Sequence, residues 1–169
     1  DGDLIFVNIM DKGIYQIRGN HLSSYLVDDF FNRKEIRFII PLNSSQKLIG
    51  TANDGILLYN GQKLSAWRPE QTDYFRKNII NRACLTSDGK IIIGTILDGI
   101  SVFDRNGTLL HRFNKENGLQ NNTVLGVMSD TNQNIWIALD KGIDFISVSP
   151  DPSFLIIERK ELGAVYTAA

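Results

Sequence analysis

Hydrophobic residues along this chain occur in short runs separated by turns rich in glycine, asparagine and aspartate. Within the runs, apolar positions alternate or are continuous, and no stretch shows the three-to-four-residue period of an amphipathic helix. Turn signals recur at roughly every 8 to 12 positions, a spacing typical of many short β-strands. The pattern therefore predicts an all-β protein, and it contains no convincing helix.

Four glycines mark an internal repeat: Gly13, Gly55, Gly99 and Gly142. Each follows an Asp or an Asp-Lys pair and precedes an apolar residue, and successive glycines are 42, 44 and 43 residues apart. A period of about 40–50 residues with four short strands is the signature of a β-propeller blade. Helical repeats would need amphipathic stretches that are absent, and β-helix coils are shorter.

Each repeat contains strands that we label A to D in chain order. Strand B precedes the marker glycine, at residues 4–7, 48–51, 91–95 and 135–138. Strand C follows it, at residues 14–17, 56–59, 100–103 and 143–146. Strand D comes next, at residues 22–26, 64–67, 109–113 and 154–157. Strand A precedes B, at residues 36–40, 80–85 and 124–128.

We therefore predict a single partial β-propeller of about four four-stranded blades. The blades are expected at residues 1–32, 33–76, 77–120 and 121–162, with residues 163–169 as the first strand of a further blade. The first blade lacks strand A in this assignment. A ring that closes on itself could use the terminal strand to complete this blade, but we expect a fragment of a longer ring because nothing in the sequence caps either end. The apolar faces at its two ends should then make the chain self-associate or dimerise.

Composition excludes several classes of protein. The formal net charge of −1 argues against a nucleic-acid binder, which needs a basic face. No run approaches the roughly 18 apolar residues that cross a bilayer. Cys84 is the one cysteine, which excludes an internal disulfide, and its apolar neighbours predict a small buried side chain rather than a reactive thiol.

The titratable residues do not form a catalytic or metal-binding pattern. His21 and His111 lie in or beside strand D, the strand farthest from the propeller axis. Asp54, Asp98 and Asp140 precede the marker glycines and are expected to cap their own turns. No phosphate-binding loop, nucleophile elbow or calcium loop is present. We predict no catalytic residue, no metal ligand, no cofactor and no enzymatic activity.

A ligand would be expected at the mouth of the ring formed by the D–A and B–C connections. The D–A segments 28–33 and 73–78 combine aromatic side chains with Arg and Asp. This combination suits sugars, because a ring can stack on the sugar face while charged groups bind its hydroxyls. The candidate ligand-binding residues are Arg33, Tyr74, Arg76 and Arg82.

Three other aromatic residues are interpreted as packing residues. Phe31 and Phe75 are expected to fill the space between blades, and Trp136 is expected to lie between neighbouring blades rather than to stack on a ligand.

The fourth repeat carries a resemblance to a known family. Its residues are Gly118-Leu119-Gln120-Asn121-Asn122-Thr123-Val124, Asp130, Asn134-Ile135-Trp136-Ile137-Ala138 and Gly142-Ile143. This segment resembles the two-component regulator propeller repeat. The fourth unit departs from the pattern at Ala138-Leu139, where Gly-Thr is usual, and the second and third units lack the Trp.

The resemblance implies a periplasmic sensor segment of a hybrid two-component receptor of Bacteroides-type bacteria. Such a receptor would detect glycan-derived oligosaccharides and regulate polysaccharide-utilisation genes, with the segment forming part of a seven-bladed ring. Kinase activity, DNA binding and the membrane anchor would lie elsewhere in the parent receptor. The alternative is a protein–protein scaffold, a propeller that transmits a signal through its surfaces without a ligand of its own.

Overall fold

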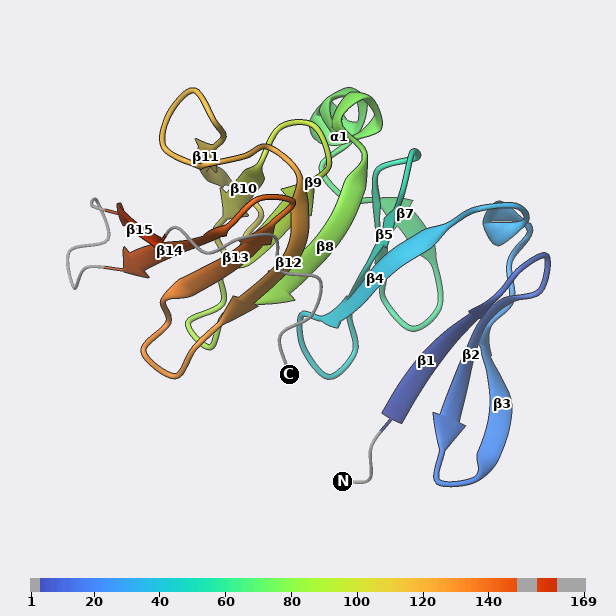
Figure 1. Cartoon of the computed structure of the whole chain (residues 1–169). Helices are drawn as coiled ribbons and strands as arrows, with labels where there is room; N and C mark the ends of the chain where they lie inside the picture. Colours follow the sequence, from blue (N-terminus) through green and yellow to red (C-terminus); the bar gives the residue numbers. More distant parts are fainter. Residues whose placement is uncertain (1–3, 149–154, 161–169) are drawn as a thin grey trace.

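The computed structural model describes residues 4–148 and 155–160, which form four antiparallel sheets arranged side by side (Figure 1). The strand expected at residues 163–169 lies outside the described residues.

The first sheet has three strands: β1 (Leu4–Ile9), β2 (Gly13–Arg18) and β3 (His21–Leu26). The other sheets have four strands each. The second contains β4 (Ile36–Pro41), β5 (Lys47–Thr51), β6 (Ile56–Tyr59) and β7 (Leu64–Ala66). The third contains β8 (Ile80–Leu85), β9 (Ile91–Thr95), β10 (Ile100–Phe103) and β11 (Leu109–Phe113). The fourth contains β12 (Val124–Ser129), β13 (Ile135–Leu139), β14 (Ile143–Val148) and β15 (Leu155–Lys160).

Strands within each sheet are neighbours in chain order, so every sheet is an antiparallel meander. The first strands of the last three sheets, β4, β8 and β12, lie next to one another and form the inner rim (Figure 1). The last strands, β7, β11 and β15, lie at the opposite edge of each sheet. Twisted four-stranded meanders packed around an inner rim define a β-propeller, and the predicted fold class, an all-β propeller fragment, is confirmed.

The hydrophobic core consists of three clusters, each enclosed by two successive sheets. Ile14 and Ile49 belong to the cluster between the first and second sheets. Leu48 and Ile93 belong to the cluster between the second and third. The third cluster joins the third and fourth sheets through side chains that include Ile92 of β9.

The continuous apolar run of β9 follows from this packing. All five of its residues are buried, because Ile91 and Ile93 face the second sheet while Ile92 faces the fourth. A strand covered on both faces has no position for a solvated side chain.

The interpretation of Phe31 and Phe75 as residues that fill the space between blades is confirmed. Phe31 is buried among residues of the first and second sheets, and Phe75 among residues of the second and third. Cys84 also packs against the third cluster as a small apolar side chain. Burial raises the pKa of the Cys84 thiol to about 12.

The expectation of a chain without helix is wrong between β7 and β8. This connection contains a 3-10 turn, η2 (Pro69–Gln71), followed by helix α1 (Thr72–Asn78). Asp73 lies in the first turn of the helix, Arg76 and Lys77 lie in the last, and these charges oppose the ends of the helix dipole. The helix has 7 residues, too few to show a helical period, and Phe75 fixes it to the core. A second 3-10 turn, η1 (Asp29–Phe31), lies between β3 and β4.

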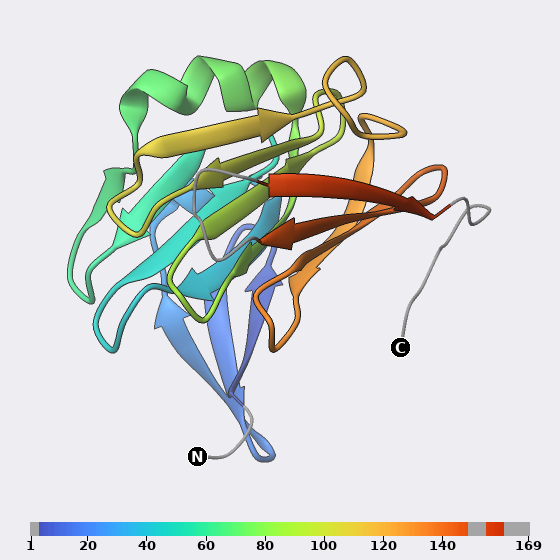
Figure 2. The same cartoon turned by 90° about the vertical axis from the view of Figure 1, so that its left-hand side faces the viewer.

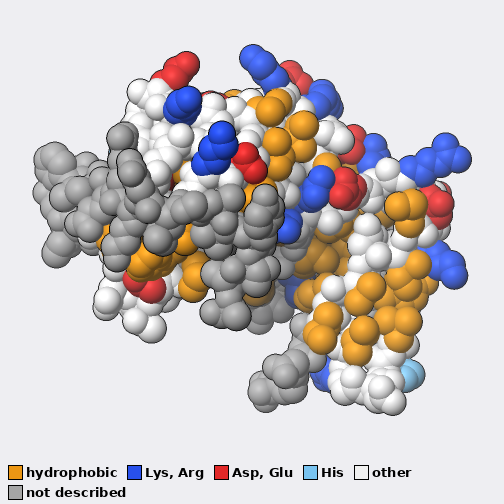
Figure 3. All heavy atoms as spheres, viewed as in Figure 1, with side chains coloured by type: hydrophobic (Ala, Val, Ile, Leu, Met, Phe, Trp, Pro, Cys, Tyr) orange, Lys and Arg blue, Asp and Glu red, His pale blue; other side chains and the backbone are white. Residues whose placement is uncertain are grey.

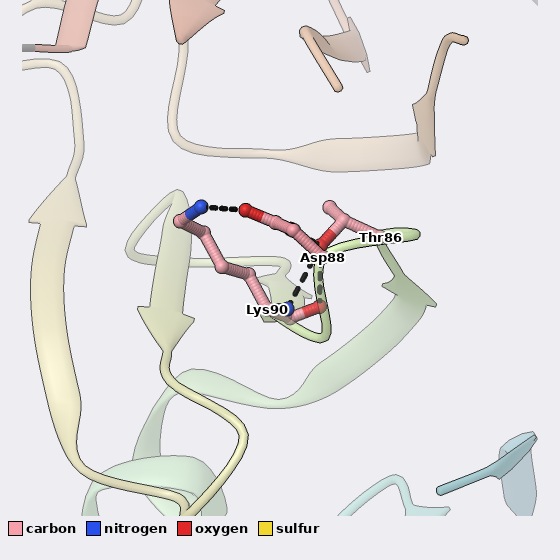
Figure 4. A network of polar contacts seen from close by, with 3 residues as sticks. All are labelled: Thr86, Asp88 and Lys90. Carbon is pink, nitrogen blue, oxygen red and sulfur yellow. Dashed lines mark hydrogen bonds and ion pairs between the residues drawn. The ribbon is translucent and has the colours of Figure 1, made fainter. Parts of the chain in front are cut away.

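The β8–β9 turn is closed by three polar side chains (Figure 4). The Thr86 hydroxyl donates to Asp88 and accepts from the backbone N–H of Lys90, and the Lys90 ammonium pairs with the Asp88 carboxylate. Partial burial acts to raise the pKa of Asp88, but the hydrogen bonds from Lys90 and Thr86 outweigh it and leave that pKa below its ordinary value. These polar contacts close the turn around the buried Thr86 side chain.

Candidate functional site

The candidate site is the end of the blades where the connections between sheets meet the β5–β6, β9–β10 and β13–β14 turns. Helix α1 and the β11–β12 connection lie at this end (Figure 2). Backbone hydrogen bonds join the two kinds of connection: Gly99 N–H donates to the Asn122 carbonyl at 2.9 Å, and Ala52 N–H to the Glu35 carbonyl at 2.9 Å. The Gly99–Asn122 bond therefore joins the third sheet to the segment that leads into the fourth, and the Ala52–Glu35 bond closes the rim of the second sheet.

Threonine side chains close the two tight turns of the rim. The Thr51 hydroxyl accepts from Asp54 N–H at 3.0 Å and donates to the Gly55 carbonyl at 2.9 Å. Thr95 makes the same pair of bonds with Asp98 and Gly99.

The prediction that Asp54 and Asp98 cap their own turns is therefore wrong. Because a threonine already satisfies each turn, both carboxylates can bind the connection that precedes their sheet. Asp140 lies on an exposed turn.

Asp98 lies at the centre of the best-connected part of the rim. Its Oδ2 accepts from the Tyr74 hydroxyl at 2.9 Å, and its Oδ1 accepts from Asn114 Nδ2 at 2.8 Å. One carboxylate thus joins helix α1, the β9–β10 turn and the β11–β12 connection.

Tyr74 is held from a second side by Arg112 of β11. The Arg112 guanidinium lies 3.7 Å from the centre of the Tyr74 ring, and its Nη2 donates to Gln71 Oε1 at 2.5 Å. Burial raises the pKa of the Tyr74 hydroxyl, with a further increase from neighbouring Asp98. One face of the ring is thus covered by a cation, and the hydroxyl is engaged with a carboxylate.

A simpler side-chain contact of this kind holds the segment between the first and second sheets. Lys34 Nζ lies 2.7 Å from Asp54 Oδ1, and both side chains are 32% exposed. The ammonium also lies 5.5 Å from the centre of the Phe30 ring. Partly exposed pairs of this kind stabilise a fold by a few tenths of a kcal/mol to about 1 kcal/mol.

In the fourth sheet the corresponding contact is made by a buried carboxylate, Asp144. It accepts from the Gln120 backbone N–H at 2.8 Å and from Gln120 Nε2 at 2.6 Å. The Gly-Leu-Gln-Asn-Asn motif therefore has a structural role. Leu119 enters the core, Gln120 satisfies Asp144, and Asn122 Oδ1 accepts from Lys115 N–H at 2.7 Å.

The four predicted ligand-binding residues lie on three different elements. Arg33 is exposed, with its backbone N–H bonded to Asp11 Oδ1 at 3.2 Å. Arg76 lies on α1 and pairs with Asp73 at 3.0 Å. Arg82 belongs to the inner strand β8, where Nη1 donates to the Asn81 carbonyl at 2.9 Å.

Tyr74, the fourth candidate, binds Asp98 and Arg112 rather than any of the three arginines. A ligand role for this set stays a prediction. The sequence reading did not identify the polar residues that hold the rim: Lys34, Gln71, Arg112, Asn114, Gln120 and Asp144. The Asp that recurs before the marker glycine is the sequence feature that indicates the contacts made by Asp54 and Asp98.

Trp136 lies on the face of β13 opposite to the third cluster. Its Nε1 donates to Asp130 Oδ2 at 3.1 Å, and its ring centre is 4.6 Å from that of Phe145. No described strand packs on this face, so the expected position of Trp136 between two blades stays a prediction.

Within the described parts of the chain, no group of three His, Cys, Asp or Glu side chains could hold a metal ion. His21 and His111 lie on β3 and β11, the last strands of their sheets, as expected. Across residues 4–148 and 155–160, no helix is long and apolar enough to span a membrane.

The sequence matches no model of a known protein family and no curated protein. The fold does match solved structures. It is similar to the extracellular domain of BT3049 from B. thetaiotaomicron, described as a hybrid two component system, with a TM-score of 0.70 and 14% sequence identity. That match covers 92% of this chain and 21% of the other.

The extracellular domain of BT4673 from the same organism, described as a one component system, gives a TM-score of 0.69 at 17% identity. That match covers 98% of this chain and 21% of the other. The chain thus spans about a fifth of the length of these structures. At such low identity the likeness establishes the propeller fold and no more.

Proposed function

We propose that this chain is a non-enzymatic, extracytoplasmic sensor segment of a signalling receptor of the two-component class. The observation that carries the proposal is the likeness of 92% of the chain to the extracellular domain of a hybrid two component system. In this proposal the segment lies in the periplasm and belongs to a ring of seven blades. Kinase activity and membrane attachment belong to other parts of the receptor.

The proposed ligand is a glycan-derived oligosaccharide bound at the mouth of the blades, which would control polysaccharide-utilisation genes through the receptor. The exposed side chains of Arg33 and Arg76 are available to bind hydroxyl or acidic groups of a sugar. Arg82, on the inner rim, would contact a part of the ligand that enters the channel. Tyr74 would contact the ligand through its hydroxyl, which also donates to Asp98, rather than by ring stacking. Arg112 already covers one face of the ring.

The hydrogen bonds that tie the rim together support this proposal. Asp54, Asp98 and Asp144 each bond the preceding connection, so these three connections are tied to the turns of the sheets that follow them. A preorganised site loses less conformational entropy when a ligand binds.

Thermal-shift measurements against an oligosaccharide library test the sensing role. A ligand at a hundredfold excess over its Kd should raise the free energy of unfolding by about 2.7 kcal/mol. Arg33→Ala and Arg76→Ala should remove the shift, whereas Lys63→Ala, in the exposed β6–β7 turn, should retain it. If no member of the library produces a shift, direct oligosaccharide sensing by this segment is rejected.

A second candidate function is a protein–protein scaffold that transmits a signal without a small ligand. It is favoured by the apolar residues at the surface of the fourth sheet, such as Met128, which is 57% exposed. A sugar-independent assembly together with a negative ligand screen would support the scaffold over the sensor.

A further inference from the structure

Asparagine followed by glycine occurs three times in this chain, at Asn60-Gly61, Asn106-Gly107 and Asn117-Gly118. In such a pair the backbone nitrogen of the glycine can attack the side-chain carbonyl carbon of the asparagine, because glycine has no side chain to hinder the approach. Asparagine is for this reason a thermolabile residue. The three pairs are identical in sequence, so only the fold distinguishes their reactivity.

The β6–β7 turn leaves the first of these pairs open to reaction. Gly61 is exposed, and a Cβ added to it would have one neighbour within 4 Å, the Ser45 carbonyl oxygen at 3.8 Å. No described residue accepts a hydrogen bond from the Gly61 N–H. The attacking nitrogen is therefore accessible to solvent base.

The Asn60 side chain is held on the side of the chain where Gly61 lies. Its Oδ1 accepts from the backbone N–H groups of Gln62 at 3.1 Å and Lys63 at 2.8 Å, and both residues follow Gly61. These two donors also stabilise the negative charge that forms on Oδ1 during the attack, as donors do in an oxyanion hole. The Asn60 Nδ2, which leaves as ammonia, makes no hydrogen bond to a described residue.

In the β11–β12 connection the fold protects Asn117. Its Nδ2 donates to the Arg112 carbonyl at 2.9 Å, and its Oδ1 accepts from the Asn114 N–H at 2.7 Å. Both partners precede Asn117 in the chain, so the side-chain amide is held over the preceding residues rather than over Gly118. Attack at this position requires both hydrogen bonds to break.

In the β10–β11 turn the fold protects Asn106 by covering the glycine nitrogen. Gly107 is buried, and its N–H donates to the Asp104 carbonyl at 2.9 Å. A Cβ added to Gly107 would lie 2.8 Å from the Trp67 ring and 2.5 Å from Arg68 Nε. The Arg68 guanidinium also donates to the Asn106 carbonyl. The attacking nitrogen is thus bonded within its turn and covered by residues that follow β7.

We propose that Asn60 is a site of spontaneous modification, at which water converts asparagine into aspartate and isoaspartate while Asn106 and Asn117 stay intact. The Gly61 amide loses its proton to solvent base, and its nitrogen forms a bond to Cγ of Asn60. The Cγ–Nδ2 bond breaks, and the side-chain nitrogen leaves as ammonia after it takes a proton from water.

Water then opens the resulting imide ring at one of its two C–N bonds. Opening at Cγ leaves aspartate at position 60. Opening at the main-chain carbonyl carbon leaves isoaspartate, in which the main chain runs through the side chain and is one carbon longer. In both cases one water is consumed and one ammonia is released overall.

The modification adds a carboxylate to a nearly neutral protein. Basic and acidic side chains are interspersed over the face shown in Figure 3, and the formal net charge is −1. One further negative charge is a large relative change, so modified molecules should separate from unmodified ones by anion exchange.

The modified turn lies at the end of the second sheet opposite to the rim, because β6 leads away from the β5–β6 turn (Figure 1). Isoaspartate lengthens the main chain directly after Tyr59, which pairs with Leu64, so it should weaken the pairing of β7. None of the candidate ligand-binding residues belongs to this turn. The proposal therefore does not depend on the sensing role.

Peptide mapping of the folded full chain after incubation in mildly alkaline buffer tests the proposal. Trypsin places the three pairs on separate peptides, residues 48–63, 106–112 and 116–141. The mass of each peptide reports replacement of the side-chain NH2 by OH, and isoaspartate gives a second form with different chromatographic retention. Asn60 should react at least about tenfold faster than either other asparagine. A rate at Asn106 or Asn117 that comes within this factor would overturn the proposal.

Urea separates the effect of the fold from that of the sequence. In denaturant the three pairs should react at similar rates, and Asn60 should react about as fast as in the folded chain. If Asn60 reacts only in urea, its turn protects it and the proposal is rejected. Arg68→Ala, which uncovers Gly107, should speed the reaction at Asn106 and leave the rate at Asn60 unchanged. An unchanged rate at Asn106 would contradict the protection assigned to Arg68.

Substitution of the reacting residue gives a direct control. Asn60→Gln would need a larger ring for the same attack, so the acidic form seen by anion exchange should disappear. Asn20→Gln, in the exposed β2–β3 turn, is the matched control and should retain the acidic form. Persistence of the acidic form in Asn60→Gln would reject Asn60 as its source.

Discussion

The hydroxyl of Tyr74 donates a 2.9 Å hydrogen bond to Oδ2 of Asp98, and this bond fixes helix α1 to the β9–β10 turn. The same carboxylate also accepts from Asn114, so the two connections that flank the third sheet are bonded to one side chain. A propeller rim held in this way keeps its blades in register at the end where a ligand would bind.

Alkaline pH should weaken this contact. Burial, the main cause, and the nearby Asp98 raise the pKa of Tyr74 above its ordinary value of 10.0. A group whose pKa is higher in the folded than in the unfolded state stabilises the fold below its unfolded pKa, and that stability is lost as the pH rises further. The unfolding free energy should therefore fall above pH 10.

Tyr74→Phe removes this titration, so the unfolding free energy of the variant should fall less above pH 10. At neutral pH the loss of the hydrogen bond should lower the unfolding free energy by about 1 kcal/mol. Urea unfolding at several pH values measures both effects. Equal pH dependence in the two proteins would contradict the assigned role of the hydroxyl.

The stability of the fold at acidic pH is expected to depend on Asp130. Its pKa lies below the ordinary value of 3.8, chiefly because Asn134 donates to the carboxylate, with a further contribution from Trp136. A group whose pKa is depressed by folding contributes stability above its unfolded pKa and loses it as the pH falls through the folded value.

The unfolding free energy should therefore decrease below about pH 4, and Asp130→Asn should show a shallower decrease. Chemical denaturation between pH 5 and pH 2 provides the measurement. Asp140→Asn, on an exposed turn, is the control and should follow the parent chain.

Gly99 should tolerate no side chain. Its φ is +65°, and an added Cβ would lie 2.0 Å from the Phe113 carbonyl oxygen and 2.8 Å from a methyl group of Leu119. Gly99→Ala should cost well over 1 kcal/mol, because backbone strain and a backbone clash add together. Gly19→Ala is the matched control, with a φ of +58° and nothing within 4 Å, and it should cost about 1 kcal/mol.

The Gly-Leu-Gln-Asn-Asn motif is expected to act through Gln120. Gln120→Ala removes the side-chain donor from buried Asp144 and should destabilise the fold by about 1–3 kcal/mol. Gln120→Glu should be at least as damaging, because it places a second carboxylate beside the first. Gln62→Ala, in an exposed turn, should have no measurable effect on thermal unfolding.

The thiol of Cys84 should react slowly in the folded chain. Burial raises its pKa to about 12, so the reactive thiolate is scarce at neutral pH. Labelling with a thiol-specific disulfide reagent should proceed at the rate of unfolding and become fast in denaturant. Rapid labelling of the native chain would show that the thiol is accessible.

The repeating pattern of the sequence determined the fold class of this protein. The glycine spacing located the repeats, and residues such as Gly55 and Gly99 have the positive φ that their turns require. The strands Ile80–Leu85 and Ile91–Thr95 have the predicted bounds, because apolar runs and turn residues are local signals.

Only the tertiary structure decided what the polar residues do. Asp98 binds Tyr74 and Asn114 because blade packing brings three connections together, and nothing in the sequence near Asp98 encodes those partners. The sequence pattern does not indicate helix α1, because the stability of this helix comes from the burial of Phe75 between two sheets rather than from a helical period. A repeat specifies each blade locally, whereas contacts between blades depend on side chains that come from different repeats.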